Sequence, residues 1–214
     1  MITELNLKNF RCFKDFKLEG IRPINLIAGG NNVGKSSLLE SIYLFYRSYL
    51  SETWIYLNDL RGFKQREHNR MLWESLFFNM DTKNKAVISI GDDEDELQTL
   101  TLQEDYSVAA KYFRHGSTDA NILNLHYKDS LTEEMHFAMA EKSKLYIRGE
   151  KGSYIICAGS KFPMYISCKT DVSHSKIAEW FSQYGVSSNE NDVVDILKSL
   201  IAALVTSLLW SGTA

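Results

Sequence analysis

The sequence predicts an α/β fold, in which N-terminal strands lead through a glycine-rich loop into a helix, followed by an antiparallel β-meander and C-terminal helices. Three observations carry this prediction. Residues 24–45 (INLIAGGNNVGKSSLLESIYLF) pass from an apolar run through glycines into a helical pattern. Between about residues 85 and 168, short apolar runs alternate with turn-like clusters. After residue 170, apolar residues recur at helical spacing.

The first elements read as a β-hairpin followed by a buried strand. Residues 2–10 (ITELNLKNF) place Ile2, Leu5 and Leu7 among polar residues, and residues 13–20 (FKDFKLEG) form a second short run. Residues 23–28 (PINLIA) are apolar enough to predict a third strand, buried on both faces.

A helix is expected from Gly34 to Leu50, because its apolar residues fall on adjoining stripes that cover much of the circumference. Residues 51–80 suggest a loop with one or two short helices, of which 71–80 (MLWESLFFNM) has the most helical pattern. The meander then comprises eight expected strands, at 85–90, 96–103, 106–113, 121–127, 133–140, 144–149, 153–159 and 163–169. Two helices follow, over 173–185 and 188–210, with Ser173 as N-cap of the first.

Composition excludes several classes of protein. The chain has 214 residues and is 44% hydrophobic, which allows a sizeable core. Its net charge of -3, from 24 basic and 27 acidic residues, argues against a surface that binds nucleic acid throughout, while a local basic patch is compatible with it. The run 193–210 is apolar, but Asp195 and Lys198 interrupt it, which disfavours a membrane span.

Cysteine and histidine usage indicates reduced thiols and shows no spacing typical of a metal site built from these residues. No C-x-x-C pair occurs among Cys12, Cys157 and Cys168, which indicates free thiols in a cytosolic protein. The five histidines show no metal-type spacing with one another or with the cysteines, and these are His68, His115, His126, His136 and His174.

The glycine-rich loop carries the clearest chemistry. Gly29-x-x-x-x-Gly34-Lys35-Ser36 matches the P-loop pattern, and its position between an expected strand and a helix is the context that the pattern requires. The backbone amides from Asn31 to Ser37 can form a concave anion site at the positive end of the helix. The predicted nucleotide-binding residues of the loop are Gly29, Gly30, Asn31, Asn32, Val33, Gly34, Lys35, Ser36 and Ser37.

Two side chains of this loop have individual roles in the prediction. Lys35 supplies a compact positive charge for the β- and γ-phosphates of ATP, and Ser36 supplies a hydroxyl for Mg²⁺. The expected cofactors are therefore ATP and Mg²⁺. The alternative is that residues 29–37 form a glycine-rich turn between a strand and a helix and that this turn binds no ligand.

Residues 2–42 resemble the N-terminal ATPase segment of the RecF/SMC/OLD-like branch of ABC-type ATPases. The motifs that carry the resemblance are KNFRCF, at residues 8–13, and GGNNVGKSSLLESI, at residues 29–42. The two asparagines point toward OLD-like or AAA-15-type ATPases, many of which act in antiphage defence. The resemblance implies a P-loop NTPase (ABC-ATPase-like) lobe, and it implies that Asn9 and Arg11 lie next to the nucleotide. Alternatively, Arg11 is an ordinary surface residue at the end of a strand.

The family pattern divides the chain into parts of one incomplete ABC-type ATPase domain spanning residues 1–214. The expected parts are a P-loop core (1–50), a helical or loop insertion (51–84), a β-rich meander (85–168) and a helical segment (170–210). Hydrolysis in this family also needs a Walker B segment and a signature loop, and no signature loop occurs in the sequence. Asp92 and Asp93 follow an apolar run, but GDDED reads better as a hairpin turn, and Asp195 lies in a helical pattern. A truncated member, or one component of a split ATPase, is therefore favoured over a complete small P-loop protein.

Two further constellations have plain interpretations. Residues 61–70 (RGFKQREHNR) carry five basic residues and one acidic residue, which suggests a solvated segment or a contact with DNA or a partner. Asp171, Ser173 and His174 are the residue types of a catalytic triad, but residues so close together at one helix start seldom adopt the geometry of a triad.

The favoured function is the ATP-binding portion of an OLD/RecF-like ATPase in DNA repair or antiphage defence. In a full-length relative, ATP would drive head-to-head dimerisation coupled to DNA. The expected partners are nucleotide and either a second copy or the remainder of a split ATPase, with DNA bound through the full assembly and no membrane. The alternative is a non-catalytic, nucleotide-gated interaction module, and an ABC transporter motor is disfavoured by the KNFRCF opening. Hydrolysis by this chain alone is expected to be slow or absent.

Overall fold

A computed structural model describes residues 1–62, 71–93, 96–104, 121–141 and 144–149 of the chain. All of them belong to the first of two compact units, Met1–Ser167 and Cys168–Ala214, and the following account concerns that first unit. The strands expected at 106–113, 153–159 and 163–169 lie outside the described residues, as do both C-terminal helices and the apolar run 193–210.

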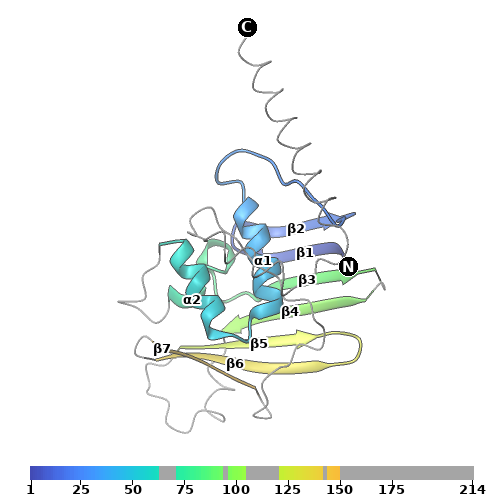
Figure 1. The fold of residues 1–214 in the computed structure, drawn as a ribbon. Helices are drawn as coiled ribbons and strands as arrows, with labels where there is room; N and C mark the ends of the chain where they lie inside the picture. Colours follow the sequence, from blue (N-terminus) through green and yellow to red (C-terminus); the bar gives the residue numbers. More distant parts are fainter. Residues whose placement is uncertain (63–70, 94–95, 105–120, 142–143, 150–214) are drawn as a thin grey trace, which may run out of the picture. The chain divides into compact units, whose positions relative to one another are not determined.

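The described strands form one sheet of seven strands in the order β2-β1-β3-β4-β5-β6-β7, and each neighbouring pair is antiparallel. The strands are β1 (Ile2–Phe10), β2 (Phe13–Glu19), β3 (Ala86–Asp92), β4 (Leu97–Glu104), β5 (Asn121–Lys128), β6 (Glu133–Glu141) and β7 (Lys144–Gly149). The hairpin and the meander expected from the sequence are therefore confirmed for these residues. They share a single sheet because β1 pairs with β3 as well as with β2 (Figure 1).

Strand β1 shows how local backbone geometry brings an additional aromatic residue into the core. Leu5 and Leu7 alternate with polar residues and are fully buried. Strict alternation would place Phe10 on the outer face with Lys8. Asn9, however, has a φ of 51°, a left-handed conformation that asparagine tolerates better than most residues. The pleat is shifted, and Phe10 is fully buried.

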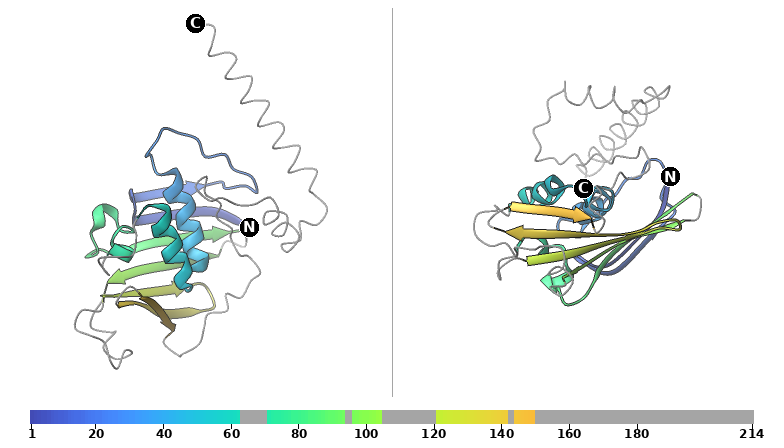
Figure 2. Two further views of the ribbon diagram at one scale, coloured as in Figure 1. Left: turned by 60° about the vertical axis from the view of Figure 1, so that its left-hand side comes forward. Right: turned by 90° about the horizontal axis from the view of Figure 1, so that it is seen from below.

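Two helices pack on one face of the sheet, as Figure 2 shows. Helix α1 (Lys35–Arg47) buries Leu38, Leu44 and Phe45, and the Phe45 ring lies 5.7 Å from the ring of Tyr127 on β5. Helix α2 (Ser51–Leu60) buries Trp54 and Leu57 beside it. The single helix expected from Gly34 to Leu50 thus ends at Arg47, and α2 begins four residues later.

The described segment that begins at Met71 is short and packs against the core. It contains α3 (Met71–Glu74) and the 3₁₀ turn η1 (Phe78–Met80), so the helical prediction for 71–80 is confirmed only for these pieces. Trp73 is fully buried and its indole N–H donates to the Glu104 carboxylate, 2.9 Å away. Phe77 forms an isolated bridge with Phe10, which joins this segment to the end of β1.

The strand predicted over 23–28 is wrong. The backbone there forms no regular element, and Ile24 and Leu26 are 51% and 77% exposed. A strand buried on both faces needs neighbours in its sheet, and none of the described strands pairs with these residues.

Candidate phosphate-binding site

The site lies at the start of α1, where the long loop after β2 returns to the sheet (Figure 1). Helix α1 begins after Gly34, which provides no side-chain cap, and its first helical hydrogen bond runs from the Leu38 amide to the Gly34 carbonyl over 2.9 Å. The amides of Lys35, Ser36 and Ser37 precede that bond. They therefore sit at the positive end of the helix, where backbone N–H groups favour an anion.

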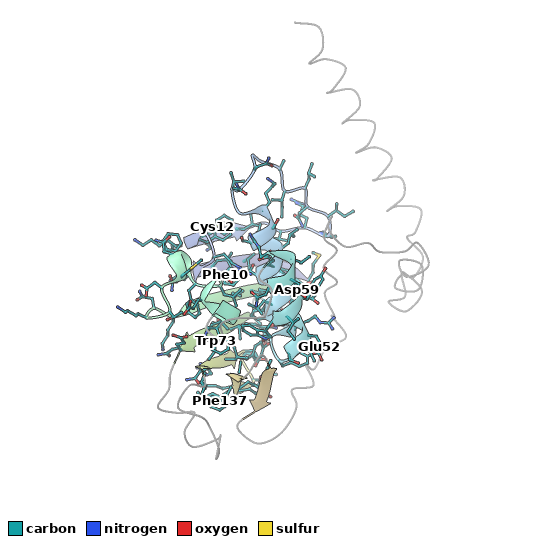
Figure 3. All side chains as sticks on the ribbon, turned by 90° about the vertical axis from the view of Figure 1, so that its left-hand side faces the viewer. Phe10, Cys12, Glu52, Asp59, Trp73 and Phe137 are labelled. Atoms are coloured by element: carbon teal, nitrogen blue, oxygen red, sulfur yellow. The ribbon has the colours of Figure 1, made fainter. Side chains whose placement is uncertain are left out.

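Only a glycine fits without strain at residue 34, where the loop meets the hairpin. Its φ is 101°, and a Cβ built there would lie 2.7 Å from the Cys12 sulfur and 2.7 Å from the Phe13 ring. The phosphate loop therefore packs directly on the turn between β1 and β2. Cys12, labelled in Figure 3, lies on the side of the sheet nearest this loop, whereas Phe137 lies at the far side.

The Lys35 side chain bonds to the backbone of the loop that precedes it. Its ammonium group donates to the carbonyl of Gly29, 2.8 Å away, and also to the carbonyl of Gly30. Lys35 thus lies across the loop that the sequence pattern assigns to the β- and γ-phosphates. Ser36 is exposed at the start of the helix, and Asn31, Asn32 and Val33 are exposed along the loop.

Asn9 and Arg11 make contacts that the sequence alone did not indicate. The Asn9 amide donates to the Asn84 carbonyl over 3.0 Å, which fixes the turn before β3. Arg11 is buried, and its guanidinium donates to the backbone carbonyl and the hydroxyl of Ser75, both at 2.9 Å. Arg11 is therefore not a surface residue. The placement of both residues beside a nucleotide remains a prediction.

Glu40 is the partner that brings several of these residues together. Its side chain is 2% exposed and lies 3.2 Å from the Arg11 guanidinium. Arg61, just after α2, donates to both carboxylate oxygens at 3.0 Å and also to the Ser37 hydroxyl at 3.0 Å. Sequence inspection did not identify Glu40, and it counted Arg61 only among the basic residues of the segment 61–70, of which residues 63–70 lie outside the described ranges. The available signal was a glutamate within a helix expected to be buried over most of its surface, which requires a cationic partner.

The acidic pair considered as a Walker B segment lies elsewhere. Asp92 pairs with Ile2 at the opposite end of β1 from the hairpin turn, and eight residues of strand separate the two ends by roughly 26 Å. The Asp92 and Glu96 backbones bond to each other, and Asp93 contacts the N-terminal ammonium group. Strands β3 and β4 pair antiparallel on either side of this segment, as the hairpin interpretation predicts, but Gly91 and Asp92 belong to β3 itself and residues 94–95 lie outside the described ranges. Asp195 lies outside the described residues, as do Asp171, Ser173 and His174.

Histidine and cysteine side chains of the described part assemble no metal site. His126 contacts Glu133 at 2.8 Å, and His136 contacts Glu134 at 3.3 Å. No group of three or more His, Cys, Asp and Glu residues there could hold a metal ion. Cys12 is free and exposed. Within the same ranges, no helix is long and apolar enough to cross a membrane.

The family comparison covers almost the entire chain. Residues 1–204 match the AAA ATPase domain family known as AAA_15. Among curated proteins, an ATP/GTP phosphatase of Helicobacter pylori is 33% identical over 103 residues, which are 48% of this chain and 27% of that protein.

Two DNA-repair proteins match a shorter stretch. The DNA double-strand break repair Rad50 ATPase of Archaeoglobus fulgidus is 50% identical over 46 residues, or 22% of this chain and 5% of that protein. The DNA replication and repair protein RecF of Acholeplasma laidlawii is 49% identical over 43 residues, or 20% and 12%. The resemblance to the RecF/SMC branch is confirmed, while the chain spans only a small part of the length of these relatives.

Proposed function

Because this chain belongs to the AAA ATPase domain family and folds its P-loop sequence at an uncapped helix start, we propose that it binds ATP through residues 29–37. The observation that carries the proposal is the arrangement of the loop itself. The amides of Lys35, Ser36 and Ser37 precede the first helical hydrogen bond of α1. The Lys35 ammonium lies across the loop by donating to the carbonyls of Gly29 and Gly30. A polyphosphate would suit both groups, because an anion is favoured at the helix amides and offers the ammonium a charged partner in place of neutral carbonyls.

The residues present also suit a magnesium ion bound together with the nucleotide. Ser36 is exposed at the helix start and would supply a hydroxyl ligand, while the phosphates would supply further oxygens. When bound, Mg²⁺ neutralises charge on the β- and γ-phosphates. Ser36→Ala is therefore expected to weaken the part of ATP affinity that depends on Mg²⁺.

The proposal is tested by comparing nucleotides of different phosphate number. Competition against a fluorescent ATP analogue in the presence of Mg²⁺ is expected to rank ATP and ADP well above AMP, because Lys35 and the helix amides act on the outer phosphates. AMP binding as tightly as ATP would contradict the assignment of the loop. Hydrolysis measured in the same samples is expected to be slow or absent for this chain alone.

The biological role follows from the relatives as a proposal. Matches to proteins named Rad50 ATPase and RecF favour a role in DNA repair, and the paired asparagines of the loop favour an OLD-like role in antiphage defence. DNA would then be bound through the full assembly. ATP-dependent association of two heads, or association with the remainder of a split ATPase, is the proposed way in which nucleotide acts.

Exposed apolar residues beside the phosphate loop support such an association. Ile24 and Leu26 alternate along the segment before the loop, and Val33 and Leu39 follow on either side of the helix start, 57% and 44% exposed. Large apolar residues exposed along the segments that flank a binding loop are candidates for an interface. This observation also keeps the nucleotide-gated interaction module as the second candidate function.

A further inference from the structure

A cluster of three charges, two of them buried, lies beside the first turn of α1. Glu40 of α1 contacts Arg11 from the β1–β2 turn at 3.2 Å and Arg61 from the end of α2 at 2.9 Å. The Arg11 and Glu40 side chains are 6% and 2% exposed, whereas that of Arg61 is 35% exposed. Three segments distant in the sequence thus meet at one carboxylate.

The charges of this cluster do not cancel. Two guanidinium groups remain cationic at all ordinary pH values and face a single carboxylate, so the cluster carries one surplus positive charge. Arg61 binds Glu40 in a fork geometry, through Nε to one oxygen and Nη2 to the other, each at 3.0 Å. This geometry holds the arginine in one orientation, because the planar guanidinium and the carboxylate match each other.

The same Arg61 nitrogen reaches into the phosphate loop. Nη2 donates to the Ser37 hydroxyl oxygen over 3.0 Å, and Ser37 is buried at the third position of α1. A hydroxyl that accepts a hydrogen bond from an arginine directs its own hydrogen toward another acceptor. Ser37 belongs to the helix turn whose amides precede the first helical hydrogen bond.

We propose that Arg61 is a positioning residue for the phosphate loop, which acts through Ser37. Glu40 anchors Arg61, and Arg61 fixes the Ser37 hydroxyl so that its hydrogen points to the bound phosphate. This inference rests on the proposed binding of ATP at residues 29–37. It adds a residue from the segment after α2 that no phosphate-loop pattern contains.

A double-mutant cycle on the full chain tests this role. Magnesium–ATP affinity is measured for the wild type, Ser37→Ala, Arg61→Gln and the double variant. Each single change is expected to weaken binding about threefold to tenfold, the range that loss of one hydrogen bond produces. The double variant is expected to bind no more weakly than the poorer single variant, because both changes interrupt the same chain of contacts.

Two further variants separate positioning from folding and from general charge. Arg61→Lys keeps the charge but cannot engage both Glu40 and Ser37 in fork geometry, so its ATP affinity is expected to fall while its unfolding midpoint stays near that of the wild type. Arg47→Gln removes the same charge at the other end of α1, roughly 18 Å away, and is expected to leave affinity unchanged.

The outcomes distinguish this inference from the proposal on which it depends. Two outcomes would overturn the role of Arg61 and leave ATP binding intact, provided that the wild type binds ATP. One is a loss of affinity in the double variant equal to the product of the two single losses. The other is full affinity in both Arg61→Gln and Arg61→Lys. Absence of ATP binding by the folded wild type overturns both. Equal losses of ATP affinity in Arg47→Gln and Arg61→Gln would mean that Arg61 acts only through its positive charge. This result would also overturn the positioning role.

Discussion

Gly34 is the residue at which the two sequence motifs of the N-terminal region touch. The phosphate loop and the NFRCF turn are separated by some twenty residues, yet no Cβ fits between Gly34 and the side chains of Cys12 and Phe13. The pairing of these motifs in one sequence thus has a steric basis. The requirement for glycine comes both from the backbone angle and from the close approach.

Gly34→Ala is expected to lower the free energy of unfolding and to weaken ATP binding. The left-handed backbone alone costs about 1–2 kcal/mol for a residue with a Cβ, and the contacts at 2.7 Å add to this cost. Gly62→Ala is the matched control, because Gly62 also has a positive φ of 80°, while no neighbouring atom among the described residues lies within 4 Å of a Cβ built there. Urea unfolding of both variants is the measurement, and equal losses would contradict the packing of Gly34 against the hairpin.

His136 makes stability depend on pH in a defined direction. Burial lowers its pKa from the ordinary value, and the neighbouring Glu134 only partly opposes this effect. The unfolded state therefore takes up a proton at about pH 6.5, while the folded state takes it up at a lower pH. The contribution of neutral His136 to the free energy of unfolding is therefore fully present above the pKa of the unfolded state. It is lost as the pH falls toward the lower pKa of the folded state.

The pH effect is measured by urea unfolding of the wild type and His136→Gln at about pH 7.5 and about pH 5.5, on either side of the ordinary histidine pKa. The wild type is expected to lose more free energy of unfolding on acidification than the variant. Parallel losses in the two proteins would show that His136 does not carry the dependence.

At the scale of elements, the connection between α1 and α2 depends on one indole. The Trp54 N–H donates to the Ser48 carbonyl over 2.7 Å, and Ser48 is the C-cap of α1. The last carbonyls of a helix have no partner within the helix, so Trp54 of α2 satisfies one of them while it fills the core. This bond joins the C-cap of α1 to the first turn of α2.

Trp54→Phe is expected to destabilise the protein by about 1–3 kcal/mol, because a buried carbonyl loses its donor. Asp59→Asn is the control, because Asp59 is exposed on the same helix. Thermal or urea unfolding measures the difference. A loss no larger than that of the control would mean that water replaces the indole without cost.

Sequence patterns predict those elements whose partners are close in the chain. The hairpin β1–β2, the start of α1 and five strands of the meander follow from alternation and helical spacing, because neighbours along the chain are neighbours in the sheet. The strand predicted over residues 23–28 is not formed. A buried strand needs neighbouring strands to pair with, and an apolar pattern does not reveal whether they are present. The Arg11–Glu40–Arg61 cluster was missed for a similar reason, because it joins three distant segments through side chains.

At the scale of the whole molecule, the exposed residues before the phosphate loop bear on assembly. Leu26 is 77% exposed, so Leu26→Asp is expected to leave the free energy of unfolding of this chain nearly unchanged. The same change is expected to reduce ATP-dependent association, measured by sedimentation with saturating nucleotide. Leu131→Asp, at a residue in the β5–β6 turn that is 89% exposed, is the control. Unaltered association of the Leu26 variant would contradict an interface at this segment.

The central claim is that residues 29–37 hold the phosphates of ATP, and Lys35 tests it most directly. Titration of labelled ATP against the wild type, Lys35→Ala and the exposed-lysine control Lys85→Ala measures the contribution of this one ammonium group. The expected result is saturable binding by the wild type and by Lys85→Ala, with affinity lost in a folded Lys35→Ala protein. Equal affinities in all three proteins would contradict the assignment of the phosphate loop.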